Sequence, residues 1–132
     1  MKSIQAVSYF VHFEDKGYVA LNKLVASKSY SSIFILVDEN THEHCYSKFI
    51  PKLATTSRIE IIEIESGEIH KNLETCTGVW TVLTELDADR KSLIITLGGG
   101  VITDLGGFVA STYKRGIDFV NIPTTLLSMV DA

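Results

Sequence analysis

Short apolar runs are spaced along the chain and predict the strands of a sheet. Three nearly continuous runs, rich in Ile, Leu, Val and Phe, lie at residues 33–37, 93–97 and 119–122. Runs of this kind are typical of parallel strands buried on both faces. The run at 59–64 contains Glu60 and Glu63, so we expect it nearer an edge of the sheet. A less regular pattern predicts one further strand between residues 4 and 13.

Helical periodicity fills the segments between these runs. It is clearest over 73–86, is present over 18–26, and is less regular over 45–53, where Pro51 stands near the end. A further helical pattern follows the glycines at 98–100. Strands that alternate with helices of this length predict right-handed crossovers. The expected fold is therefore α/β, with a Rossmann-like, doubly wound and mostly parallel sheet.

Length and composition indicate one folded domain. The chain has 132 residues, of which 45% are hydrophobic and 21% charged, against a prior of about 150 residues per domain. Its net charge of −4 argues against a nucleic-acid partner. It has no apolar run long enough for a membrane span or a secretory signal. Its two cysteines, Cys45 and Cys76, lack metal or redox spacing, so we expect a cytoplasmic protein without a membrane partner.

The charged residues are unevenly distributed. Only five of the 28 Asp, Glu, Lys and Arg residues follow residue 91, whereas six of the nine glycines lie between Gly98 and Gly116. The apolar, glycine-rich end has no polar tail. We therefore expect residues 1–132 to be one domain of a longer protein.

The strongest candidate site follows the predicted strand 93–97. Gly98, Gly99 and Gly100 join this strand to a helical pattern. Glycines let a ligand approach backbone N–H groups, and a helix N-terminus favours negative charge, so the segment predicts a phosphate cradle. It is not a complete G-x-G-x-x-G fingerprint, because residue 103 is Thr, and no P-loop Lys follows. A tight turn without a ligand is the alternative.

Two other strand ends carry polar residues. Asp38 and Asn40 follow the first apolar run, where a carboxylate can bind ribose hydroxyls. The alternative is that Asn40 or Thr41 caps the next helix. Beyond the second run, Glu68 and Lys71 are three residues apart and could offer an acceptor and a cation to a nucleotide. An exposed surface pair is the alternative there.

Two more clusters have chemical potential. His42, His44 and Cys45 have the composition of a metal site, but residues two apart on a helix do not face each other, so we predict no metal site there. Lys114 and Arg115 close the last helical pattern, where the helix dipole favours cations. The alternative is ordinary helix termination before Gly116.

The motifs of the last third resemble those of 3-dehydroquinate synthase, in the sugar phosphate cyclase superfamily. The resemblance rests on residues 98–108 (GGGVITDLGGF), 113–116 (YKRG) and 123–131 (PTTLLSMVD), and on the earlier Asp-x-Asn and Ser-Gly-Glu-x-x-Lys elements. It implies the amino-terminal NAD-binding domain of a two-domain shikimate-pathway enzyme. On this resemblance, we expect the helical carboxyl-terminal domain of that family to lie outside residues 1–132.

The resemblance also implies roles for individual residues. The residues that match cofactor contacts are Asp38, Asn40, Glu68, Lys71, Gly99, Gly100, Val101, Asp104, Thr124 and Thr125. Arg115 matches a residue that binds the substrate phosphate, either in the site of the same subunit or in the site of a partner subunit. Asp131 matches a residue that contacts the substrate hydroxyls. Thr103 stands where many members have Gly, which we expect to alter packing and not cofactor choice.

The family converts 3-deoxy-D-arabino-heptulosonate 7-phosphate to 3-dehydroquinate and phosphate, with NAD returned unchanged. This implies a phosphate-eliminating lyase of aromatic amino acid biosynthesis, commonly a homodimer. Its divalent metal, zinc or cobalt, belongs to the carboxyl-terminal domain, so no catalytic or metal-binding residue is expected here and the isolated chain is expected to be inactive. The alternatives are an NAD-dependent polyol dehydrogenase-like domain, another sugar phosphate cyclase, or a free-standing nucleotide-binding module.

Overall fold

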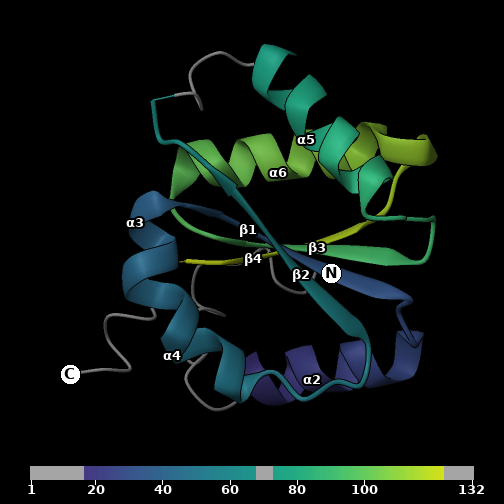
Figure 1. The fold of residues 1–132 in the computed structure, drawn as a ribbon. Coiled ribbons are helices and arrows are strands. Elements are labelled where there is room, and N and C mark those ends of the chain that lie inside the picture. Colours follow the sequence, from purple (N-terminus) through teal and green to yellow (C-terminus); the bar gives the residue numbers. More distant parts are fainter. Residues whose placement is uncertain (1–16, 68–72, 124–132) are drawn as a thin grey trace.

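A computed structural model describes residues 17–67 and 73–123, in which helices cover both faces of a parallel sheet (Figure 1). The strands pair in the order β2-β1-β3-β4. They are β1 (Ser32–Asp38), β2 (Arg58–Ile64), β3 (Ser92–Leu97) and β4 (Asp118–Ile122). All three pairings are parallel, which confirms the doubly wound α/β fold. The strand predicted at 4–13 lies outside the described residues.

The helices agree with the predicted periodicity in three of four places. The single helices are α2 (Tyr18–Lys28), α5 (Leu73–Glu85) and α6 (Gly100–Thr112). After β1 comes a composite helical stretch: α3 (Glu39–Thr41), the π-helical turn η3 (His42–Tyr46), α4 (Ser47–Phe49) and the 3-10 turn η4 (Ile50–Lys52). The helix predicted over 45–53 therefore begins earlier, at Glu39.

Two hydrophobic cores lie on opposite faces of the sheet. Along β1, Ile33, Ile35 and Val37 pack on the side of α2, whereas Phe34 and Leu36 pack on the side of α5 and α6. Figure 1 shows these helices on the two faces. Burial on both faces explains why the central strands are continuous apolar runs. In the described part of the chain β2 is an edge strand, as its two glutamates predicted.

The strand order creates a switch point between β1 and β3. The chain passes from β1 to β2 on one side, then returns to β3 on the other side of β1 and continues to β4. The helical stretch after β1 and the helix α6 after β3 lie on opposite faces of the sheet (Figure 1). In open α/β sheets, ligands bind beyond the carboxyl ends of the strands at such a point. The ends of β1 and β3 thus mark the expected crevice.

Asp89 connects two strands at the opposite, amino-terminal edge of the sheet. Its Oδ1 accepts hydrogen bonds from Ser31 Oγ at 2.6 Å and from the Lys91 N–H at 2.9 Å, just before β1 and β3 begin. The hydrogen bond from Ser31 is the main reason that the pKa of Asp89 is lowered. The ionised carboxylate therefore stabilises this edge.

We expect Asp89→Asn to lower the free energy of unfolding by about 1 kcal/mol near neutral pH, after solvent screening is allowed for. Because the folded-state pKa lies below the unfolded value of about 3.9, this stabilisation is complete above that value and is lost as pH falls through the folded pKa. Urea titrations of parent and variant at about pH 6 and about pH 3 measure it. Asp87→Asn is the control, since no described residue is hydrogen-bonded to the Asp87 carboxylate. A loss that stays the same at both pH values would contradict the assignment.

None of the helices in the described ranges combines the length and the apolar character needed to cross a membrane.

Candidate functional site

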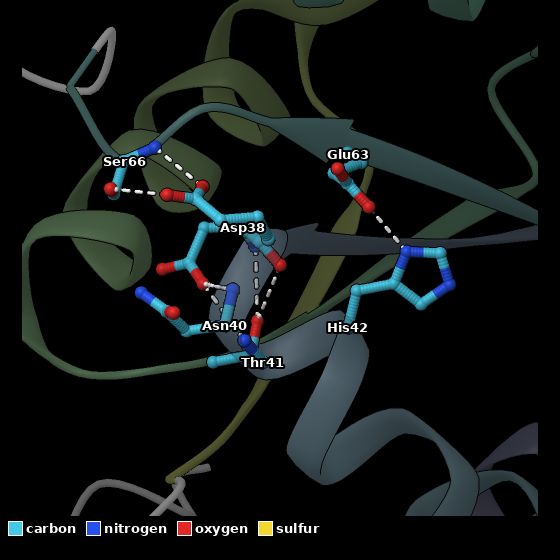
Figure 2. A network of polar contacts seen from close by, with 7 residues as sticks. Asp38, Asn40, Thr41, His42, Glu63 and Ser66 are labelled. Atoms are coloured by element: carbon cyan, nitrogen blue, oxygen red, sulfur yellow. Dashed lines mark hydrogen bonds and ion pairs between the residues drawn. The ribbon is translucent and has the colours of Figure 1, made fainter.

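Asp38 ends β1 and caps the helical stretch that follows it. Its Oδ1 accepts hydrogen bonds from the backbone N–H groups of Asn40 and Thr41, both at 2.8 Å, and the Thr41 hydroxyl accepts one from the Asp38 N–H at 3.0 Å (Figure 2). The alternative in which Asn40 or Thr41 is the N-cap is therefore wrong, because the helix begins one residue after Asp38. The bonds from described residues all use Oδ1. Oδ2, beside the exposed Asn40, is left to accept from a ligand hydroxyl.

Glu39 joins the end of β1 to the turn after β2. Its two carboxylate oxygens accept hydrogen bonds from the Ser66 N–H at 2.8 Å and from Ser66 Oγ at 2.7 Å. The bond from the Ser66 hydroxyl is the main cause of a lowered pKa at Glu39. Sequence reasoning missed this contact, because only the pairing of β1 with β2 brings the two residues together. Glu68 and Lys71 follow this turn and lie outside the described residues.

The histidine cluster after β1 does not converge on one point. His42 Nδ1 pairs with Glu63 Oε1 of β2 (Figure 2), and the His42 ring lies edge-on to Tyr46. His44 is exposed, whereas Cys45 is buried. Over residues 17–67 and 73–123, no group of three or more His, Cys, Asp and Glu side chains is placed to hold a metal ion.

Gly99 and Gly100 open the helix α6 without any side-chain cap. Gly99 is the N-cap, with extended backbone angles (φ −88°, ψ −162°), and no side chain accepts from the first N–H groups of the helix. A Cβ built on Gly99 or on Gly100 would meet no atom of the described residues within 4 Å. Unsatisfied N–H groups at a helix N-terminus that face open space suit a phosphate. Among the described residues, the turn therefore leaves room for a pyrophosphate.

Gly98 has a different role from its two neighbours. Its N–H donates to the Ile122 carbonyl at 3.2 Å, which holds the turn against the end of β4. A Cβ at this position would lie 2.0 Å from Ile102 Cγ2. Gly98 thus lets the first turn of α6 pack closely onto the sheet. Val101 and Asp104 are exposed on the outer side of the same helix.

The turn and Asp38 lie side by side at the switch point. The pairing of β1 with β3 ends at Leu36 and Thr96, and Asp38 and Gly98 each follow two residues later, at the carboxyl ends of these neighbouring strands. The carboxylate at the end of β1 and the N–H groups after β3 therefore lie at the same, carboxyl-terminal edge of the sheet. Thr124, Thr125 and Asp131, also predicted to belong to the site, lie outside the described residues.

Arg115 lies at the other end of α6. The helix has 13 residues, which at 1.5 Å per residue separates its two ends by about 20 Å. It ends at Thr112, and the 3-10 turn η6 (Tyr113–Arg115) follows, so the expectation that Lys114 and Arg115 close the helix itself is wrong. Both residues have left-handed backbones, with φ values of 45° and 71°. Within one chain, Arg115 and the glycine turn therefore lie at opposite ends of α6.

Comparison with known proteins gives the same family that the motifs suggested. The family model described as 3-dehydroquinate synthase N-terminal matches residues 61–132. The 3-dehydroquinate synthase of Parabacteroides distasonis is 41% identical over 112 residues, which cover 85% of this chain and 31% of that protein. The chain therefore spans about a third of that relative's length.

Solved structures share the fold. The 2-deoxy-scyllo-inosose synthase complexed with carbaglucose-6-phosphate, NAD+ and Co2+ has a TM-score of 0.63 at 23% identity, over 80% of this chain and 29% of that chain. The 2-epi-5-epi-valiolone synthase from Streptomyces hygroscopicus subsp. jinggangensis, with NAD+ and Zn2+ bound, has a TM-score of 0.56 at 26% identity, over 74% of this chain and 28% of that chain. The likeness at 23% identity concerns the fold alone.

Proposed function

The chain belongs to the 3-dehydroquinate synthase family, and we propose that it is the amino-terminal, NAD-binding domain of such an enzyme. The observation that carries the proposal is the uncapped glycine turn at the switch point of the sheet, beside the carboxylate of Asp38. A dinucleotide needs both features, an anion site for its pyrophosphate and an acceptor for its ribose. The bound NAD+ of the valiolone synthase, which shares the fold, supports the same cofactor here.

The described residues fit two parts of the dinucleotide, the adenosine ribose and the pyrophosphate. Asp38 Oδ2 would accept from a ribose hydroxyl, with Asn40 beside it, while Oδ1 continues to cap the helix. The N–H groups of Gly100 and Val101, at the positive end of α6, would donate to the pyrophosphate, with Asp104 on the rim. We assign the remaining contacts to Glu68, Lys71, Thr124 and Thr125. NAD, when bound, supplies a hydride acceptor for transient oxidation of a substrate alcohol.

We further propose that the substrate is a sugar phosphate and that Arg115 and Asp131 bind it. Because Arg115 lies about 20 Å from the glycine turn, it would reach the substrate phosphate in the site of a second subunit. Its left-handed backbone, which costs energy in a non-glycine residue, supports a functional placement. We place the divalent metal of the family in the part of the protein that follows residue 132.

The test is phosphate release from 3-deoxy-D-arabino-heptulosonate 7-phosphate by the product of the complete reading frame. We expect NAD-dependent formation of 3-dehydroquinate and phosphate without accumulation of NADH, and no release by a chain that ends at Ala132. Accumulation of NADH with a polyol substrate would instead indicate a dehydrogenase. Release that continues after all NAD has been removed would contradict the proposal.

A further inference from the structure

A polar network beneath the glycine turn joins three elements. Thr103 Oγ1, in the first turn of α6, lies 2.8 Å from the Gly99 carbonyl oxygen and 2.8 Å from Asn121 Oδ1 of β4. Asn121 Oδ1 also accepts a hydrogen bond from Thr96 Oγ1 of β3 at 2.6 Å. Thr96 and Asn121 are paired residues in the sheet, and Thr96 is fully buried. The Thr103 hydroxyl therefore contacts β4 directly, through Asn121, and β3 indirectly, through the bond from Thr96 to Asn121.

The carbonyl of Gly99 determines where the Gly100 N–H points. The two groups belong to one peptide unit, which is planar and trans, so they point in opposite directions. Thr103 donates to this carbonyl from its N–H at 3.0 Å, and its single hydroxyl proton is shared between this carbonyl and Asn121 Oδ1. With the carbonyl directed into the helix, the Gly100 N–H is directed out of its N-terminus, toward the open space beside the turn.

We propose that Thr103 is a positioning residue for the cofactor: it orients the Gly99–Gly100 peptide so that the Gly100 N–H is preset to donate to a pyrophosphate. The inference rests on the proposed function, since it presumes that NAD binds at this turn. It goes beyond the expectation that Thr103 alters packing and not cofactor choice. A glycine at this position would leave the carbonyl with the backbone bond alone.

Helical threonines often donate to the carbonyl four residues earlier, and Thr81 does so in α5, to Thr77 at 2.9 Å. Two features separate Thr103 from that pattern. Its acceptor is the carbonyl of the N-cap residue, the first acceptor of the helix, and this carbonyl shares a peptide with the Gly100 N–H. Its hydroxyl also has a second partner, Asn121, on a neighbouring strand. Thr81 therefore provides a matched control with the same local contact and no link to the turn.

The experiment compares Thr103→Val, Thr103→Ser and Thr81→Val in the full-length protein. We expect Thr103→Val to raise the Kd for NAD about fivefold, because one oriented hydrogen bond is lost. Thr103→Ser keeps the hydroxyl and should restore the parent Kd within about twofold, and Thr81→Val should not change it. Calorimetric titration measures NAD binding. Saturation-transfer NMR measures the binding of adenosine, which has no phosphate and should bind all variants equally.

Each outcome decides a different claim. An unchanged Kd for NAD in Thr103→Val, or an equal loss in Thr81→Val, would overturn the positioning role and leave the proposed function standing. Parallel loss of NAD and adenosine binding would show a general distortion of the domain, which would also overturn it. If the parent protein does not bind NAD, the proposed function itself fails.

Discussion

Replacing Gly100 with valine will weaken NAD binding by the full-length protein by at least about 100-fold and leave the fold intact. A Cβ at this position meets no atom of residues 17–67 and 73–123 within 4 Å, so this part of the chain has room for the new side chain. That room is the space we assign to the pyrophosphate, and the side chain would occupy it. Calorimetric titration with NAD measures the loss.

Two further variants separate binding from stability. Gly100→Ala should also weaken NAD binding, yet raise the free energy of unfolding by about 0.5 to 1 kcal/mol, because alanine favours the first turn of a helix over glycine. Gly78→Val is the matched control, since Gly78 lies in α5 and also has open surroundings. If Gly100→Val binds NAD with the parent's affinity, the glycine turn is not the pyrophosphate site.

Replacing Gly106 with alanine will lower the free energy of unfolding by about 2 kcal/mol. A Cβ on Gly106 would lie 2.3 Å from Thr96 Cγ2 and 3.1 Å from Phe119 Cε1, where α6 packs on β3 and β4. The helix or the buried Thr96 side chain must therefore shift, and we expect the cost of this shift to exceed the gain in helix propensity. Urea denaturation of the full-length protein, followed by a probe in this domain, measures the change.

The neighbouring glycine and a second substitution test the cause. A Cβ on Gly107 would find its nearest atom, in Phe119, at 3.5 Å, an ordinary contact, so Gly107→Ala should be neutral or stabilising. Thr96→Ser removes the clashing Cγ2 and keeps the hydroxyl that donates to Asn121, so it should restore part of the loss in Gly106→Ala. Equal losses at Gly106 and Gly107, without such a rescue, would show that helix–sheet packing is not the reason.

The sheet could be predicted from the sequence because its central strands are buried on both faces. Such strands are unbroken apolar runs, and β1 and β3 have every residue buried except Asp38, which ends β1. The start of the helix after β1 could not be predicted. Asp38, Asn40 and Thr41 are all residue types that cap helices, and only the backbone conformation selects Asp38.

The candidate site was predicted where it depends on local sequence and missed where it depends on strand pairing. Three glycines between a strand and a helix are a local signal, and the structure places them at the switch point. The contacts of Glu39 with Ser66 and of Thr103 with Asn121 join residues that only the strand order brings together. The distance of Arg115 from the turn follows from the length of α6, which the periodicity could have supplied.

Hydrogen exchange at the glycine turn tests the central claim most directly. In the full-length protein, we expect added NAD to slow exchange of the amide protons of Gly100 and Val101, because these N–H groups would become donors to the pyrophosphate. Protection of the amide protons in peptides that cover residues 98–104, measured by mass spectrometry with and without NAD, is the predicted result. Tight NAD binding without protection of this segment would contradict the account.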